Sequence, residues 1–271
     1  MEKTDHEKTH LRSKESERYN ASLISSLEIL DFLGTVERSA SLAEIRHTLK
    51  LNKSRVMRLC GTLEHMGYLV YDPEQEVYSL GPRLMSLGKV YERQTSVLHV
   101  IRPVLQHIVD QLGETASFHV QRGDCRLCLC AVESPHQVRY IMKEGSEGHW
   151  PFGSIWKVIM AFGAAELRER ILSEAPFVPE TPYSAVTRQD IESVVEQTAE
   201  LGYCLTNGDH DVGSSAIALP VFDSDGTLKG VLCISGITER MNAAFNERAI
   251  PFLKEQARRL SAILEGRPIR V

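Results

Sequence analysis

The sequence of 271 residues has no long apolar run, few aromatic residues and no excess of positive charge. No stretch approaches the roughly 18 apolar residues that a membrane-spanning helix needs, so no membrane partner is expected. The first twenty residues, MEKTDHEKTHLRSKESERYN, contain no apolar segment and do not resemble a secretory signal. We therefore expect a cytoplasmic protein whose residues 1–19 form a disordered polar tail.

The six cysteines occur without a secretory leader, which favours reduced thiols over a disulfide framework. Three of them, Cys125, Cys128 and Cys130, lie within CRLCLC. In a regular strand Cys128 and Cys130 face the same side, so a tetrahedral metal site would need further ligands such as His119. We interpret these cysteines as small strand hydrophobes and expect no metal or cofactor, with a thiol sensor as the alternative.

The net charge of −5 is unevenly distributed along the chain. Residues 1–93 contain equal numbers of acidic and basic side chains, so the acidic excess lies wholly beyond them. Within this balanced part no carboxylate occurs between Lys50 and Glu64, yet three cations do. A solvated helix face explains such a cluster when a helix stands alone, so the surrounding pattern has to decide.

Residues 20–81 show three short helical patterns followed by a hairpin. The first pattern has four leucines at helical spacing, Leu23, Leu27, Leu30 and Leu33. The second opens at Ser41, where Glu44 completes a capping box. The third is capped by Asn52 or Ser54, and YLVYDPEQEVYSL then alternates around a turn. This order predicts a winged helix-turn-helix domain.

The third helix of such a domain presents its first turns to the major groove. Its polar positions are Asn52, Lys53, Ser54, Arg55 and Arg58. Arginine pairs with guanine in a bidentate manner, whereas lysine and serine contact phosphates. The pattern therefore predicts that these five residues bind double-stranded operator DNA.

The rest of the chain mixes helical and strand patterns. Residues 82–95 form a helical connector, and residues 96–271 contain strand-like segments such as TASFHVQ, IALPVFD and LKGVLCISG between helices. This arrangement predicts an α+β domain with an antiparallel sheet flanked by helices.

Two long segments carry a family resemblance. SLAEIRHTLKLNKSRVMRLCGTLEHMGYLVYDPEQEVYSLGPRLMSLG is similar to the DNA-binding half of the isocitrate lyase regulator (IclR) family of bacterial transcription factors. GETASFHV, AVES, GYCLTNGDHDVGSSAIALPVFDSDG and GVLCISG resemble the effector-binding half of that family. The resemblance implies a homodimer or a dimer of dimers on operator DNA, with a small-molecule effector in a GAF-like domain.

The resemblance also implies the positions of an effector pocket. Matched position by position, the pocket residues are Ser154, Ile155, Thr206, Ser214, Ala216, Cys233 and Ser235. The chain departs from the family pattern at Thr206, where an Asp is usual, and at Trp156, where a Gly is usual. With Trp150 and Phe152, this indole suggests either a bulky apolar ligand or additional core. Small side chains beside a helix N-terminus suit a ligand carboxylate.

The sequence therefore predicts a regulator whose operator binding is controlled by an organic or aromatic acid. The alternatives are a thiol- or metal-responsive regulator that uses CRLCLC and, less favoured, a GAF-like enzyme. No nucleophile lies at a spacing that forces it beside a histidine and an acid, so we do not expect an enzyme.

Overall fold

The computed structural model describes residues 19–36, 38–94, 96–267 and 269. The chain divides into two compact units between Gln94 and Thr95. Of the predicted tail, residues 1–18 lie outside the described residues. The predicted domain boundaries at residues 81 and 95 remain predictions. The helix after the hairpin belongs to the N-terminal unit.

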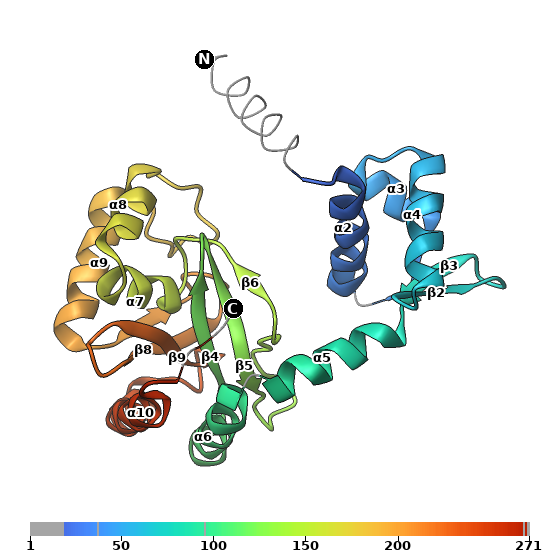
Figure 1. Cartoon of the computed structure of the whole chain (residues 1–271). Helices are drawn as coiled ribbons and strands as arrows, with labels where there is room; N and C mark the ends of the chain where they lie inside the picture. Colours follow the sequence, from blue (N-terminus) through green and yellow to red (C-terminus); the bar gives the residue numbers. More distant parts are fainter. Residues whose placement is uncertain (1–18, 37, 95, 268, 270–271) are drawn as a thin grey trace. The chain divides into compact units, whose positions relative to one another are not determined.

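The N-terminal unit contains four helices and a small sheet among its described residues (Figure 1). The elements are α2 (Ala21–Val36), β1 (Ala40–Ser41), α3 (Leu42–Leu49), α4 (Lys53–His65), β2 (Leu69–Asp72), β3 (Val77–Leu80) and α5 (Pro82–Gln94). The strands pair antiparallel in the order β1-β3-β2. One apolar cluster joins α2, α3, α4 and the sheet, which gives the predicted winged helix-turn-helix.

Local capping explains where α3 and α4 begin. The Ser41 side chain accepts from the Glu44 N–H while the Glu44 carboxylate accepts from the Ser41 N–H, so the predicted capping box is present. Asn52, and not Ser54, caps α4, because its Oδ1 accepts from the Arg55 N–H at 2.9 Å.

Helix α2 turns a different face inward than its leucine pattern suggests. Leu33 is buried, whereas Leu23 and Leu27 are 59% and 51% exposed. The inner face is instead made by Ser25, Ile29 and Leu33, which keep the spacing of a helix. Ser25 is an inward polar residue because it accepts a hydrogen bond from α4, which a hydrophobic pattern does not reveal.

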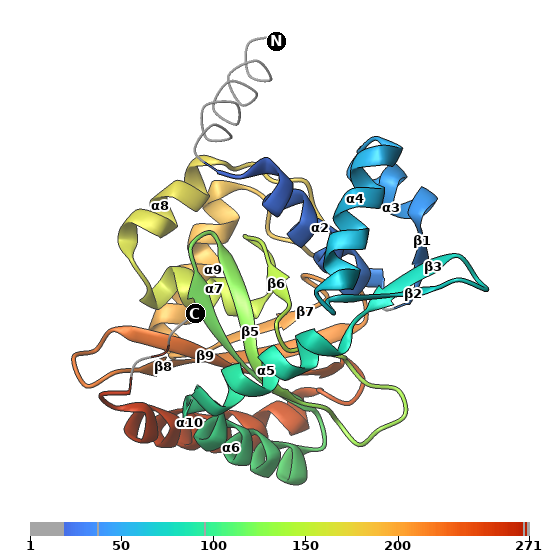
Figure 2. The same cartoon turned by 45° about the vertical axis from the view of Figure 1, so that its right-hand side comes forward.

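The C-terminal unit is built around a six-stranded antiparallel sheet of order β6-β5-β4-β9-β8-β7. The strands are β4 (Thr115–Arg122), β5 (Cys125–Val132), β6 (Glu147–Gly148), β7 (Cys204–Asn207), β8 (Ser214–Phe222) and β9 (Leu228–Ile237). The helices are α6 (Ser96–Leu112), α7 (Ser154–Phe162), α8 (Ala165–Ser173), α9 (Arg188–Leu201) and α10 (Ala243–Leu264). Helices α6 and α10 cover one face of the sheet, and α7 to α9 lie on the other (Figures 1 and 2).

Alternation along the strands separates these two layers. On β4, Ala116, Phe118 and Val120 join the core beneath α6 and α10. Ser117 and His119 point to the opposite face, where the core is more polar and includes Cys233 of β9. The layer beneath α7 is therefore the one that can hold polar chemistry.

A β-bulge places Cys128 and Cys130 on opposite faces of the sheet, unlike the arrangement expected from the sequence. The pairing of β4 with β5 shifts between Phe118 and His119, so that Phe118 lies opposite Cys130 and His119 opposite Cys128. Cys130 thereby joins the core beneath α6 and α10, and Cys128 does not. The prediction that Cys128 and Cys130 share a face is wrong, because one extra residue reverses the alternation.

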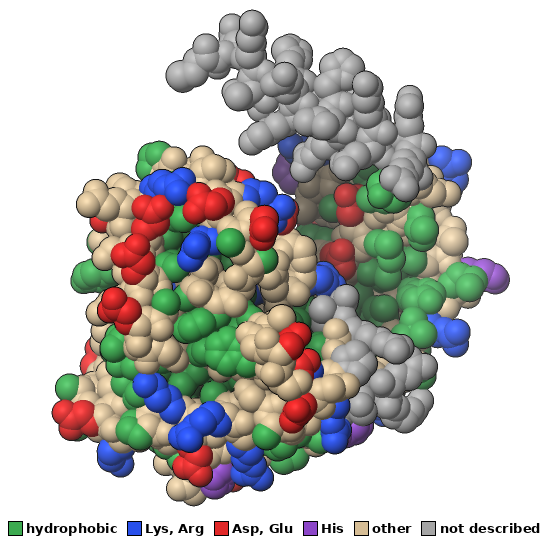
Figure 3. Space-filling model, turned by 60° about the vertical axis from the view of Figure 1, so that its left-hand side comes forward, with side chains coloured by type: hydrophobic (Ala, Val, Ile, Leu, Met, Phe, Trp, Pro, Cys, Tyr) green, Lys and Arg blue, Asp and Glu red, His purple; other side chains and the backbone are tan. Residues whose placement is uncertain are grey.

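The surface of the C-terminal unit carries charges of both signs. Figure 3 shows acidic and basic side chains interspersed on one face of this unit. Several form exposed ion pairs on α8 and α9, among them Arg188 with Glu169 and with Glu192. Among the described residues, no helix is long and apolar enough to cross a membrane.

Buried His119 generates a testable pH dependence. Its ring is fully buried, its Nε2 lies 2.9 Å from the Ser117 Oγ, and its Nδ1 has no hydrogen-bond partner among the described residues. Burial, reinforced by the positive charge of Arg126, holds the pKa of His119 well below its usual range. The folded chain therefore keeps this imidazole neutral under conditions in which the unfolded chain protonates it.

We expect the free energy of unfolding to fall as the pH drops below about 6.5, by up to about 1.4 kcal/mol per pH unit from this residue. Urea unfolding between pH 5 and 7 measures the slope, which His119→Gln should reduce. Exposed His99, changed to Gln, is the matched control on α6. An unchanged slope in the His119→Gln protein would contradict this account.

Candidate functional site

The exposed face of α4 is the candidate DNA-reading surface. Val56, Leu59, Cys60 and Leu63 are buried, which fixes the rotation of the helix. The side chains of Asn52, Lys53, Ser54 and Arg58 are consequently exposed. No carboxylate lies on the helix before Glu64, so the first three turns carry net positive charge.

Arg55 differs from the other four predicted DNA-binding residues. Its Nη2 donates to the Ala21 carbonyl oxygen at 2.9 Å and to the Ser25 Oγ at 3.1 Å, both on α2. The guanidinium therefore ties α4 to α2 and does not extend from the reading face. Sequence spacing places Arg55 on the polar face of α4 but cannot reveal a partner thirty residues away.

Met57 is a residue of this surface that sequence reasoning missed. Its side chain is 52% exposed between Lys53 and Arg58, although it is apolar. With Arg46, Lys53 and Tyr71, it lines a groove of about 690 Å³ between the two helices of the motif and the wing. The sequence does hold a sign of this exposure, because Met57 lies off the helical repeat of Val56, Leu59 and Leu63 that forms the buried face of α4. An exposed apolar side chain here suits contact with a thymine methyl group.

A small cavity lies in the C-terminal unit between the polar face of the sheet and the start of α7. All seven residues predicted for the effector pocket line it: Ser154, Ile155, Thr206, Ser214, Ala216, Cys233 and Ser235. Its volume is about 30 Å³, far below the several hundred Å³ of pockets for drug-sized ligands. The structure thus brings the predicted residues together around a space suited to a small ligand.

Strand pairing explains why these residues converge. Thr206 lies opposite Ala216, and Ala216 lies opposite Ser235, so β7, β8 and β9 each direct at least one small side chain to the cavity. The Cys233 Sγ lies 3.4 Å from the Ser235 Oγ and 3.9 Å from the Ser154 Oγ. Hydroxyl and thiol groups therefore line the wall beneath α7.

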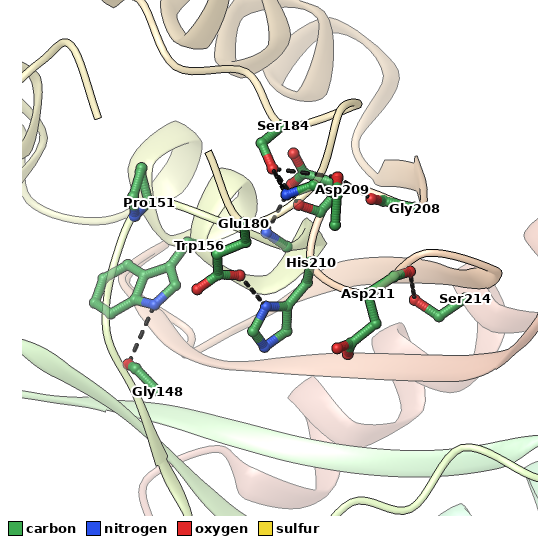
Figure 4. Close-up of polar contacts among 12 residues, drawn as sticks. Gly148, Pro151, Trp156, Glu180, Ser184, Gly208, Asp209, His210, Asp211 and Ser214 are labelled. Atoms are coloured by element: carbon green, nitrogen blue, oxygen red, sulfur yellow. Dashed lines mark hydrogen bonds and ion pairs between the residues drawn. The ribbon is translucent and has the colours of Figure 1, made fainter. Parts of the chain in front are cut away.

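A buried ion pair positions the other side of the cavity. The Lys157 Nζ lies 2.9 Å from the Asp209 Oδ2, with side-chain exposures of 1% and 8%. The same carboxylate oxygen accepts from the Gly153 N–H at 2.7 Å, and the Lys157 Nζ also donates to the Pro151 carbonyl oxygen. These bonds attach the start of α7 to the β7–β8 loop, where Asp209 and its neighbours lie close together (Figure 4).

The three aromatic residues expected to enlarge or fill the pocket do not line it. Trp156 is fully buried in the core beneath α7 to α9, and its Nε1 donates to the Gly148 carbonyl oxygen at 3.2 Å (Figure 4). Trp150 packs edge-on against this indole, and Phe152 against Phe177. These side chains belong to the core, so the interpretation as additional core is the better one.

The two buried thiols of CRLCLC, Cys128 and Cys130, lack the low pKa of a redox sensor. Burial raises the pKa of both Cys128 and Cys130 to about 12, which keeps these thiols protonated and poorly nucleophilic near neutral pH. Cys125 lies 3.6 Å from the His149 Nδ1 at the edge of the sheet. Within the described part of the chain, no group of three or more His, Cys, Asp or Glu residues is placed to hold a metal ion.

Sequence reasoning missed several residues of the cavity, chiefly Arg126, Tyr140, Asp209 and His210. Arg126 is 8% exposed and lies on β5. The Tyr140 hydroxyl donates to the Asp211 carboxylate at 2.8 Å, and His210 pairs with Glu180 (Figure 4). The signal for Arg126 was a charge inside an apolar strand, and the signal for Asp209 was its place in the family stretch GYCLTNGDHD, where a Glu is usual.

Two family models match the chain in consecutive segments. The IclR helix-turn-helix domain matches residues 22–73, and the C-terminal domain of the bacterial transcriptional regulator IclR matches residues 90–262. The second match alone covers more than half of the chain, and together the two include the reading helix and the cavity.

Individual relatives agree with these matches. The HTH-type transcriptional regulator BhcR of Paracoccus denitrificans is 28% identical over 87% of this chain and 84% of its own length. A crystal structure of an IclR transcriptional regulator from Alicyclobacillus acidocaldarius has a TM-score of 0.80 at 27% identity, covering 90% of this chain and 98% of that one.

An IclR homologue from Microbacterium hydrocarbonoxydans, crystallised with 4-hydroxybenzoate, shares the fold with a TM-score of 0.76 at 19% identity, covering 90% of this chain and 99% of that one. The chain belongs to the IclR family of transcriptional regulators, which are not enzymes, and combines a DNA-binding helix-turn-helix with a C-terminal effector-binding domain.

Proposed function

We propose that this regulator binds operator DNA through the exposed face of α4 and that a small organic acid in the sheet cavity changes its affinity for that DNA. The observation that carries the DNA half is the position of Lys53, Ser54 and Arg58 on a helix face whose rotation is fixed by its buried side. Arg58 suits a base contact, and Lys53 suits a phosphate contact.

The cavity volume supports a small acid over an aromatic one. At about 30 Å³, with Tyr140 and Met142 in its wall, the cavity leaves little room for an aromatic ring. The relative from Microbacterium hydrocarbonoxydans holds 4-hydroxybenzoate, but its identity of 19% transfers only the fold. The effector class is therefore proposed here from the residues of this chain.

Exposed apolar side chains support the proposed homodimer or dimer of dimers. On α2 and α5 the exposed set comprises Leu23, Ile24, Leu27, Met85, Leu87, Val90 and Tyr91. Apolar surface of this kind is often covered by a partner, and two copies of a helix-turn-helix read two half-sites. We propose that these helices contribute to the contact between copies.

The DNA proposal is tested with a duplex selected from a random library by the full-length protein. Arg58→Ala should weaken binding to that duplex by about 1–3 kcal/mol if it removes one base contact, with unchanged thermal stability. Lys53→Ala should weaken all duplexes alike and reduce the salt dependence by about one phosphate contact.

Arg55→Ala is expected to affect stability, in contrast to Arg58→Ala and Lys53→Ala, which are expected to affect DNA binding. It should lower the free energy of unfolding by about 1–2 kcal/mol, because α4 loses two hydrogen bonds to α2. Mobility-shift and thermal-unfolding measurements separate the two effects. If Arg58→Ala bound the selected duplex as tightly as the wild type, α4 would not be the reading helix in the proposed way.

The effector proposal is tested by screening small organic acids for release of that duplex. For any acid that acts, Ser235→Ala should weaken its binding by about 1–3 kcal/mol, with unchanged affinity for DNA in its absence. Exposed Ser224, changed to Ala, is the matched control. Calorimetry that found equal affinity in the wild type and Ser235→Ala would remove β9 from the effector site.

A further inference from the structure

Arg126 is a buried cation at the wall of the cavity. It is the second residue of β5 and lies opposite Gly148 of β6 in the sheet register. Its side chain extends along Gly148 so closely that a Cβ placed there would lie 2.6 Å from the guanidinium carbon. A side chain at position 148 would therefore make the guanidinium shift from this position, in which Arg126 is 8% exposed and borders the cavity.

In the part of the chain that the structure describes, Arg126 has neither a hydrogen-bond partner nor an ion pair, although arginine carries five donors and a permanent charge. The acids around the cavity are engaged elsewhere. The Asp209 carboxylate binds Lys157 and the Gly153 N–H, and Asp211 accepts from Tyr140. On the neighbouring strand, Glu147 pairs with Arg122.

A buried charge without a partner is costly, and native structures normally pair it. The positive charge of Arg126 acts on neighbouring groups. Burial raises the pKa of Cys128 and of Tyr140, and the charge of Arg126 lowers both. Two other polar residues of the wall have partners, because Asp209 pairs with Lys157 and His210 contacts Glu180. Arg126 is thus the charged residue of the cavity wall that has no ion pair among the described residues.

The start of α7 adds hydrogen-bond donors to the same space. The cap residue Gly153 has φ +80° and no side chain, and its own N–H is bonded to the Asp209 carboxylate. Ser154 and Ile155 border the cavity, and the first N–H groups of a helix have no acceptor within it. The positive end of the helix dipole therefore points toward the space that Arg126 borders.

We propose that Arg126, beside the start of α7, binds the carboxylate of the small aliphatic acid, and that its positive charge is the main determinant of effector recognition. The inference rests on the proposed function of the cavity as the effector site. A single arginine with a few N–H and hydroxyl donors suits one monoanionic group, and the volume of about 30 Å³ suits an acid of a few carbons. A neutral amide of the same shape leaves the guanidinium uncompensated and is rejected.

The experiment uses the full-length protein at constant ionic strength in thermal-shift and calorimetric titrations. The probes are formate, acetate, glycolate and pyruvate, the neutral formamide, acetamide and 2-hydroxyacetamide, and benzoate and inorganic phosphate. At least one small carboxylate should raise Tm in a saturable manner, and its amide should have no effect. Arg126→Gln should weaken that binding at least tenfold. Arg122→Gln, on the neighbouring strand, should bind as the wild type does.

Two further variants distinguish a binding role from a structural one. Arg126→Met removes the buried charge and should leave Tm unchanged or higher in buffer without carboxylate, whereas loss of a structural contact would lower it. Gly148→Ala keeps the charge but displaces the guanidinium, and it should weaken carboxylate binding.

Four outcomes would overturn the inference: no saturable effect of any small carboxylate, an effect from phosphate or benzoate alone, equal binding of an acid and its amide, or undiminished binding by Arg126→Gln. Its failure is distinguishable from failure of the proposed function. An acid that releases DNA equally well from Arg126→Gln would leave the effector function standing. Carboxylate binding without any change in DNA affinity would remove the regulatory function and leave the Arg126 site in place.

Discussion

The ion pair between Lys157 and Asp209 determines where the cavity of this regulator lies. Both groups are withdrawn from water, and each also bonds to the backbone ahead of α7, through the Pro151 carbonyl and the Gly153 N–H. Charges buried to this extent keep their partners, because removal of one leaves the other uncompensated. The start of α7 is therefore held against the β7–β8 loop, where Ser154 and Ile155 border the cavity.

Arg126, unlike Lys157, is a buried cation without an ion pair among the described residues. Lys157 satisfies its charge within the protein, whereas Arg126 is buried along Gly148 with no carboxylate to meet it among the described residues. Arg55 offers a further contrast, since it is an ordinary polar-face residue by spacing but is engaged by α2. The three cations show that the partner of a side chain, and not its place on a helix or strand, decides whether it builds the fold or remains available to a ligand.

Much of the fold was accessible from sequence because its signals are local. Ser41 and Glu44 form a capping box from four consecutive residues, and the alternation of YLVYDPEQEVYSL gives the two strands of the wing. The seven cavity residues were found through the family resemblance, which carries tertiary information that spacing lacks. The predictions that went wrong depended on contacts distant in the chain. Cys130 was reversed by a bulge, and Leu23 and Leu27 of α2 are exposed where Ser25 is buried.

The same reasoning explains why the effector class required the structure. Trp156 stands where the family pattern has glycine, and the sequence left open a bulky apolar ligand or additional core. In the structure its indole bonds to the Gly148 carbonyl within the core. The residue that argues for a small anion, Arg126, stands in an otherwise apolar strand and gives no sign of the missing partner.

Regulation places one more physical requirement on this site. A ligand shifts operator affinity only to the extent that it binds the DNA-competent and incompetent arrangements unequally, and a shift from 1:99 to 99:1 needs about 5.5 kcal/mol of difference. A carboxylate that neutralises a buried guanidinium can provide part of that difference only if the two arrangements bury Arg126, or orient the start of α7, to different degrees. The ion pair between Asp209 and Lys157 fixes one wall of the cavity. A structural difference between the two arrangements would then have to lie in the other walls, which include Tyr140 and Met142.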